Sequence, residues 1–216
     1  MKLNAVILAD DSVECDIREL CILLRETTSR LLEQYQQAHA NVNVDNKILS
    51  SDLITTNNLA DNLSAINLKN FISFWYGHGE KDKFKIANDA IVTTTVNHYV
   101  FSNALIYTFS CFSGQELADV LIANKAIAFV GYNKEVQCPL GIDEITSQIA
   151  NTFIISFLIQ GKQVKEAVSD LRTAYDNVIY GDYVDPIRRS LFQTNRDSLV
   201  LKGDGNLKID DFIILN

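Results

Sequence analysis

A histidine and a cysteine each follow a short apolar run in this sequence. His78 comes after residues 70–75, NFISFW, and Cys111 comes after residues 104–109, ALIYTF. A thiolate can attack a carbonyl carbon while an imidazole accepts and then returns the proton. If the two runs are parallel strands of one sheet, both side chains emerge at the same sheet edge. The pair therefore predicts a catalytic Cys–His dyad.

The residues around the pair favour this chemistry. Gly77 and Gly79 flank His78, and glycine allows a ligand to approach the backbone closely. Gly114 opens a predicted helix three residues after Cys111, and a cysteine near a helix N-terminus gains thiolate character. Taken alone, a cysteine at a strand end is usually a small buried apolar residue. The two motifs together favour a shared site.

The elements that must position this pair alternate between strands and helices. Residues 5–9, AVILA, predict a strand buried on both faces. Asp11 and Glu14 fit a capping box, which predicts that the first helix begins there and runs to about Gln37. The remaining predicted elements are a strand within 42–54, a short helix in 57–67, strands at 70–75, 104–109 and 126–130, a hairpin at 84–95, helices at 114–124, 142–161 and 164–178, and a final hairpin around 203–205. This order predicts an α/β sandwich with a mostly parallel sheet in a single domain covering residues 1–216.

Composition excludes several classes of function. The chain has 216 residues and a net charge of −8, with 19 Lys and Arg against 27 Asp and Glu. An acidic chain without a basic run is a poor binder of nucleic acid and of anionic lipid. No apolar stretch is long enough to span a membrane, and the 4 cysteines form no CxxC pair. We therefore expect a reduced cytoplasmic protein with no nucleic-acid partner, no membrane partner, no cofactor and no metal.

The two motifs resemble those of a known group of enzymes. WYGHGE at 75–80 is similar to the His-Gly motif of the caspase-like cysteine peptidase clan, and IYTFSCFSG at 106–114 is similar to its strand–Cys–Ser-Gly motif. AIAFVGY at 126–132 resembles the strand after the catalytic helix, and the tail SLVLKGDGNLKI resembles the final strand and turn of CHAT and gingipain-like members. His78 and Cys111 are closer in sequence than the interval of about 50 residues in caspases, whose Q-A-C-x-G pentapeptide is absent. The resemblance is therefore to the metacaspase, CHAT and clostripain–gingipain branch, in a compact bacterial form.

This resemblance implies a fold, an activity and roles for the site residues. The fold would be a three-layer αβα sandwich with a mostly parallel central sheet. The activity would be that of a cysteine endopeptidase acting on a protein or peptide substrate. Cys111 would be the nucleophile and His78 the general base and acid. The backbone N–H groups of Gly79 and Cys111 would form the oxyanion hole.

Specificity is predicted from two loops. In relatives the loop after the first strand contributes to the pocket for P1, the residue before the cut, and here that loop holds Asp10 and Asp11. Carboxylates there favour Arg or Lys at P1, although Asp11 is equally suited to cap a helix. Phe109 stands where metacaspases have an aspartate, which leaves an apolar P1 open. Tyr132 and Glu135, in the loop after the strand at 126–130, are the other predicted substrate-binding residues.

Two other readings and one form of regulation stay open. The domain could be a catalytically silent caspase-like module that binds or scaffolds other proteins. It could also be an ordinary α/β domain that binds a small ligand, although no G-x-G-x-x-G or Walker motif follows a strand. If the enzyme is regulated, we expect an activating protein partner or an ordering of the loops around the cleft.

Overall fold

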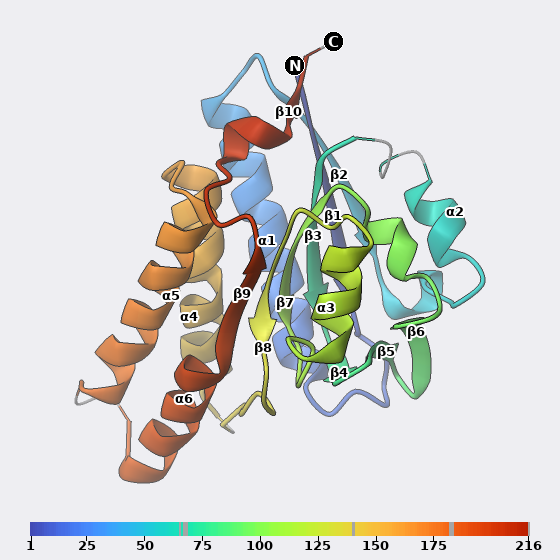
Figure 1. Cartoon of the computed structure of the whole chain (residues 1–216). Coiled ribbons are helices and arrows are strands. Elements are labelled where there is room, and N and C mark those ends of the chain that lie inside the picture. The colour runs from blue at the N-terminus through green and yellow to red at the C-terminus, as the bar shows by residue number, and fades with distance from the viewer. Residues whose placement is uncertain (65, 67–68, 140, 182–183, 216) are drawn as a thin grey trace.

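The computed structural model describes residues 1–64, 66, 69–139, 141–181 and 184–215. The chain forms a central sheet with helices on both faces, and both termini lie at the same end of the molecule (Figure 1). None of the helices in the described part is long and apolar enough to cross a membrane.

The central sheet is mostly parallel. Its order is β2–β1–β3–β7–β8–β9, and β10 pairs with the first residues of β1. The first five strands in this order are parallel, whereas β9 and β10 are antiparallel to their neighbours. The strands are β1 (Lys2–Ala9), β2 (Asn43–Leu49), β3 (Phe71–Tyr76), β7 (Ala104–Phe109), β8 (Ala128–Tyr132), β9 (Leu199–Gly203) and β10 (Ile213–Ile214). The carboxyl ends of β1, β3, β7 and β8 therefore meet at one edge.

The apolar runs are continuous because both faces of the sheet are buried. In β1, Ala5 and Ile7 belong to one hydrophobic cluster, and Val6 and Leu8 belong to the other. Residues that alternate in a strand point to opposite faces, so a strand covered on both sides needs apolar side chains at every position. All residues of β3, β7 and β8 are buried in the same way.

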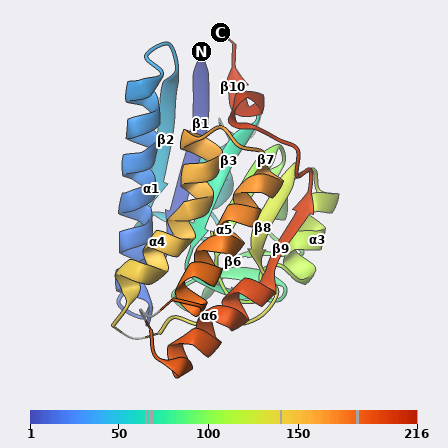
Figure 2. The ribbon, with the colours of Figure 1, turned by 90° about the vertical axis from the view of Figure 1, so that its left-hand side faces the viewer.

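Four long helices cover one face of the sheet, as Figure 2 shows. They are α1 (Arg18–Ala38), α4 (Asp143–Ile154), α5 (Val164–Ile179) and α6 (Pro186–Ser198). The opposite face is covered by α2 (Leu59–Leu63), α3 (Glu116–Ala123) and a small antiparallel sheet of β4 (His78–Glu80), β5 (Lys83–Ile86) and β6 (Asp89–Thr93). The predicted three-layer αβα fold with a mostly parallel sheet is confirmed.

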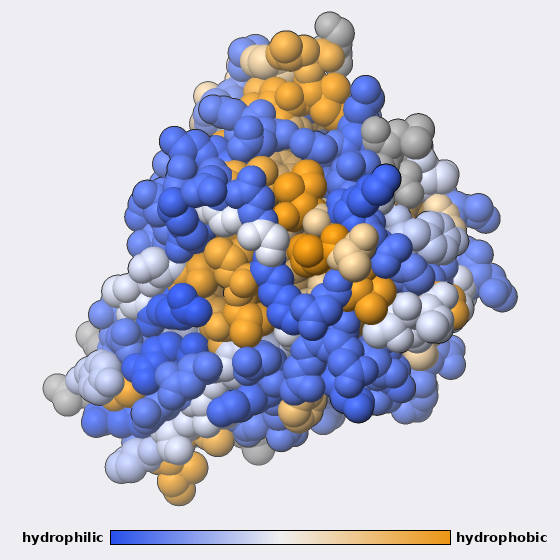
Figure 3. Space-filling model, in the orientation of Figure 1, coloured by the Kyte–Doolittle hydropathy of each residue, from blue (hydrophilic) through white to orange (hydrophobic). Residues whose placement is uncertain are grey.

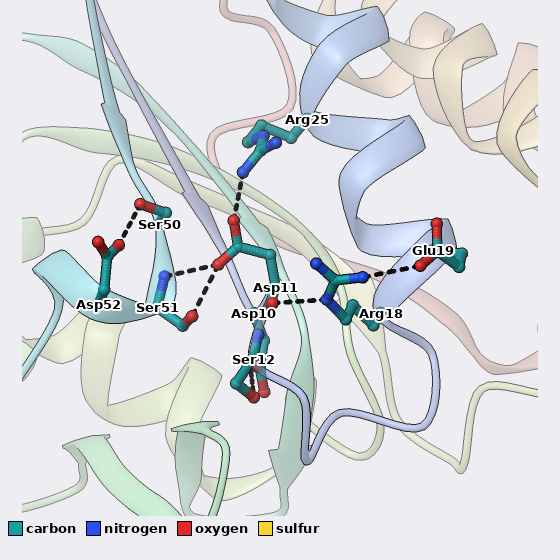
Figure 4. Close-up of polar contacts among 9 residues, drawn as sticks. All are labelled: Asp10, Asp11, Ser12, Arg18, Glu19, Arg25, Ser50, Ser51 and Asp52. Atoms are coloured by element: carbon teal, nitrogen blue, oxygen red, sulfur yellow. Dashed lines mark hydrogen bonds and ion pairs between the residues drawn. The ribbon is translucent and has the colours of Figure 1, made fainter.

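The start of the first helix was predicted wrongly. The helix α1 begins at Arg18, and its N-cap is Ile17 rather than Asp11. The carboxylate of Asp11 instead accepts hydrogen bonds from the N–H and Oγ of Ser51 and pairs with Arg25 (Figure 4). Because the Asp11 carboxylate bonds Ser51, just after β2, and Arg25 of α1, it does not cap the helix. Residues 10–17 form a loop.

The tail also differs from its prediction. Residues 199–203 form a strand, but this strand pairs with β8, and no return strand follows Gly205. The chain crosses to the other end of the sheet, where β10 pairs with β1. The helix α6 was not predicted, although Asp185 at its N-cap and Pro186 at its first position are ordinary start signals.

Candidate active site

A pocket of about 240 Å³ opens at the carboxyl edge of the parallel strands. The segment before α1 and the ends of β3, β7 and β8 form its walls. These strands end at the lower end of the molecule, which is largely hydrophilic on the face seen in Figure 3. The lining residues are Asp16, Ile17, Gly77, His78, Phe109, Ser110, Cys111, Glu135, Val136, Gln137 and Cys138. The structure therefore brings His78 and Cys111 to one pocket.

His78 is held by contacts from the loop after β1. Its Nε2 lies 3.3 Å from Oδ1 of Asp16, and the side chain of His78 is 32% exposed. A hydrogen bond with Cys15 raises the pKa of His78, burial opposes this effect, and the negative charges of Asp16 and Asp10 add to it. An imidazole with a raised pKa holds a proton more readily, which suits a group that accepts a proton from a thiol.

Cys111 is half-buried directly after β7. Its Sγ accepts a hydrogen bond from the backbone N–H of Val136 at 3.3 Å. Burial raises the pKa of the Cys111 thiol, and the Val136 N–H partly offsets this rise. The next residue, Phe112, has a φ of 54°, a left-handed conformation that is uncommon for a residue with a side chain. A strained residue beside a chemically capable one is a frequent feature of functional sites.

The thiol of Cys111 and the imidazole of His78 have different hydrogen-bond partners in the resting structure. Among the hydrogen bonds of the described residues, none joins Cys111 to His78: the thiol faces Val136 and the imidazole faces Asp16 and Cys15. A proton transfer between them therefore requires a side-chain rotation or a movement of the pocket wall. Hydrogen bonds that serve catalysis are often long or unformed before substrate binds.

Gly79 lies against Ser110 and Cys111. A Cβ atom at this position would be 2.6 Å from the carbonyl oxygen of Cys111 and 3.1 Å from Cβ of Ser110. Such distances leave no room for a side chain, so only glycine lets β4 approach the Cys111 carbonyl and the Ser110 side chain this closely. The two residues predicted to form the oxyanion hole are thus neighbours.

Asp10 and Asp11 do not line the pocket, contrary to the predicted role in substrate binding. Asp10 is fully buried, and its carboxylate accepts hydrogen bonds from Ser12 and from the N–H of Ala87. Asp11 is engaged with Ser51 and Arg25, as described above (Figure 4). Both carboxylates hold the loop after β1 in place, and neither is among the residues that line the pocket.

The two residues predicted after β8 have different positions. Tyr132 is fully buried, and its hydroxyl lies 2.9 Å from that of Tyr175 between the sheet and α5, so it does not reach a substrate. Glu135 is exposed and lines the pocket. Of the four predicted substrate-binding residues, Glu135 alone keeps a place at the site.

Three residues at or beside the pocket were not predicted from the sequence as site residues. Asp16 reaches the pocket because the helix starts later than predicted. Cys15, expected on the first helix, lies before it and is 5% exposed, and a hydrogen bond from Cys21 lowers its pKa to about 6 against the effect of burial. Cys138 lines the pocket, and burial raises its pKa to about 12. The available signal for the later helix start was that the apolar residues at helical spacing begin only at Ile17.

Comparison with known proteins identifies the fold. No family model and no curated protein sequence matches the chain. Among solved structures, the Arg-specific cysteine proteinase gingipain R (RgpB) matches with a TM-score of 0.67 and 15% identity over 95% of this chain and 47% of that one. The complex of the pro- and mature domains of RgpB from Porphyromonas gingivalis matches with a TM-score of 0.58 and 14% identity, over 95% of this chain and 48% of that one. A structure described as a protease matches with a TM-score of 0.59 and 13% identity over the same shares of the two chains.

The chain thus spans about half the length of the proteins it matches. The resemblance that the two motifs imply is confirmed at the level of the fold. Over nearly its whole length, this chain has the caspase-like fold of gingipain R, with the segments of His78 and Cys111 at the carboxyl edge of its sheet.

Proposed function

We propose that this protein is a cysteine endopeptidase in which Cys111 is the nucleophile and His78 the general base and acid. One observation carries the proposal. Cys111 and His78 line the same pocket, at the ends of the adjacent parallel strands β7 and β3, in a fold shared with cysteine proteinases.

Acylation begins when His78 takes the proton of the Cys111 thiol. The sulfur electron pair then attacks the carbonyl carbon of the scissile peptide, and the carbonyl oxygen becomes an oxyanion. The N–H groups of Gly79 and Cys111 stabilise this negative charge, which is the largest single contribution in many acyl transfers. His78 returns the proton to the leaving amine, and the C–N bond breaks.

Deacylation uses the same groups. His78 accepts a proton from a water molecule, the resulting hydroxide attacks the thioester, and the C–S bond breaks as the leaving thiolate of Cys111 takes the proton back from His78. In the resting structure, the carboxylate of Asp16 lies 3.3 Å from Nε2 of His78, where its negative charge favours the imidazolium form.

The pocket favours a basic residue at P1. Asp16 and Glu135 place two carboxylates in its wall, and neither Lys nor Arg is among the described residues that line it. The side chain of Asp16 is 82% exposed, so it can turn toward a substrate. A guanidinium or ammonium group would form charge-assisted hydrogen bonds with these carboxylates.

We also propose activation by a partner protein or by substrate itself. The thiol is bound to the N–H of Val136 and the imidazole to Asp16, so both must leave these partners before a proton passes between them. A protein that docks on the loop around Val136 would release Cys111. A chain that cleaves peptides at full rate when purified alone would contradict this part of the proposal.

The test is covalent labelling with a peptidyl acyloxymethyl ketone carrying Arg at P1, with the labelled residue assigned by mass spectrometry. We expect modification of Cys111, slowed about 100-fold or more by His78→Ala, since general-base catalysis contributes at least that factor. The variant His39→Ala is the matched control, because His39 lies at the far end of α1. Cys138 is not expected to compete, because its pKa is raised to about 12. Labelling of Cys111 that is slow and indifferent to His78 would instead indicate the silent binding module.

A further inference from the structure

Three side chains of the kinds that bind metal ions converge beside the pocket. One ligand atom each of Asp10, Cys15 and His78 lies within 4.8 Å of the other two. Asp10 and Cys15 both lie in the loop 10–17 between β1 and α1, and His78 begins β4, so two segments far apart in the sequence supply the group. Within the described part of the chain, this is the one such group of three.

The donor atoms select a class of ion. A carboxylate oxygen, a thiolate sulfur and an imidazole nitrogen together are typical of zinc, whereas magnesium and calcium prefer oxygen ligands alone. Ligands of one tetrahedral zinc ion are roughly 3.4–3.6 Å apart, given the usual bond lengths of about 2.0–2.3 Å. The upper limit of 4.8 Å therefore requires the group to contract by little more than 1 Å.

The surroundings hold two of the ligands in place. Asp10 is fully buried, and hydrogen bonds from Ser12 and from the N–H of Ala87 orient its carboxylate. The backbone of Gly77 lies against it, since a Cβ there would be 2.9 Å from Cβ of Asp10. Cys15 is 5% exposed. Oriented ligands of this kind lose little freedom when an ion binds.

The third ligand, His78, gives an ion access to the group from the pocket. His78 is part of the pocket wall, and its side chain is 32% exposed. An ion can therefore enter from the pocket and keep a water molecule in its fourth position. The thiolate and the carboxylate balance the charge of a divalent ion, and Asp16 beside His78 adds a further negative charge.

We propose that Asp10, Cys15 and His78 form a zinc site with one open position facing the pocket. A bound ion occupies a nitrogen of His78. If the proposed peptidase function holds, zinc therefore removes the general base and inhibits hydrolysis reversibly. This consequence rests on the proposed function, but the binding of the ion does not.

Cobalt(II) binding to the purified full chain tests the site without any substrate. A tetrahedral site with a thiolate ligand gives intense d–d bands and a sulfur-to-cobalt charge-transfer band in the near ultraviolet. We expect both bands in the wild type, and we expect addition of zinc to abolish them. In the variant Cys15→Ser the charge-transfer band is lost, and His78→Ala weakens cobalt binding at least about tenfold.

Two further variants identify the thiol. Cys111→Ser and Cys138→Ser are the matched controls, because both residues line the pocket without belonging to the group, and both should keep the cobalt spectrum. Loss of the charge-transfer band in Cys111→Ser with its retention in Cys15→Ser would overturn the assignment. The absence of cobalt and zinc binding at millimolar metal would overturn the site itself. Circular dichroism confirms that each variant is folded.

Inhibition separates this proposal from the proposed function. We expect zinc to inhibit peptide cleavage, EDTA to restore it, and Cys15→Ser to raise the inhibitory zinc concentration at least about tenfold. A chain that gives the cobalt spectrum but cleaves nothing retains the metal site and contradicts the peptidase. A chain that cleaves peptides but gives no cobalt spectrum supports the peptidase and contradicts the metal site.

Discussion

Two segments bring a cysteine to the same edge of the sheet, the loop 10–17 after β1 and the turn 110–114 after β7. Cys111 is half-buried in the pocket wall, and its sulfur faces the N–H of Val136. Cys15 is buried beneath the wall, where it contacts both His78 and Cys21. The cysteine that directly follows its strand reaches the pocket, and the cysteine in the longer loop contacts the imidazole.

This difference separates two requirements of a nucleophile. Cys15 has the lower pKa, about 6, but a side chain that is 5% exposed cannot meet a peptide. Cys111 lines the pocket, but burial raises its pKa. Under the proposed function, access therefore selects Cys111 as the nucleophile, His78 takes its proton, and the contact with Cys15 describes a resting arrangement of His78.

The largest expected effect comes from replacing each of the two cysteines in turn. Cys111→Ala removes the atom that forms the bond to substrate, so kcat/KM for an Arg peptide should fall at least about 10³-fold. Cys15→Ala removes a contact of His78, and the expected fall is roughly tenfold. Steady-state cleavage of a fluorogenic peptide measures both. The reverse order would make Cys15 the nucleophile.

The next effect concerns Gly79, which lies against the turn 110–114. Gly79→Ala places a Cβ 2.6 Å from the carbonyl oxygen of Cys111, so β4 must move away from the cysteine turn. We expect kcat to fall about 100-fold, the size seen when one oxyanion donor is lost, with a smaller change in KM. A kcat within threefold of wild type in a folded variant would rule out the assignment of Gly79 to the oxyanion hole.

A smaller effect concerns the loop 10–17 as a source of specificity. Asp16→Asn and Glu135→Gln each remove one carboxylate from the pocket, and each should lower the preference for Arg over Leu at P1 roughly tenfold. The measurement is the ratio of kcat/KM for two peptides that differ at P1 alone. Asp11→Asn is the control outside the pocket, because its carboxylate is bound to Ser51 and Arg25. An unchanged ratio in both pocket variants would leave an apolar P1 as the better prediction.

The smallest effect lies outside both segments. Asp170 pairs with Lys162 at 2.6 Å, and this hydrogen bond lowers the pKa of Asp170. The pair therefore stabilises the folded chain fully above the unfolded pKa of about 3.9, and its contribution is lost as pH falls through the folded pKa. Urea unfolding should show Asp170→Asn to be less stable by under about 1 kcal/mol at pH 7, with a smaller difference at pH 3. A difference that grows on acidification would contradict this assignment.

Local patterns were sufficient for most of the fold. The runs in β1, β3, β7 and β8 are apolar at most positions because both of their faces are buried, and such runs are visible without a structure. The helices α3, α4 and α5 were predicted from apolar spacing. One error arose because a side chain has a distant partner. Asp11 was predicted to cap a helix, but it bonds Ser51, which is 40 residues away in the sequence.

The sequence by itself therefore determined the αβα fold and the placement of His78 and Cys111 at one sheet edge, because strand ends and the residues after them are local features. The tertiary structure decided which carboxylates reach the pocket and which thiol contacts the imidazole. Asp16 and Cys15 lie beside His78 in the loop before α1, which begins at Arg18, and Asp11 of the same loop bonds Ser51, in the turn after β2, and Arg25 of α1. A pattern of neighbouring residues carries no record of such contacts, because their partners come from segments that meet only when the chain is folded.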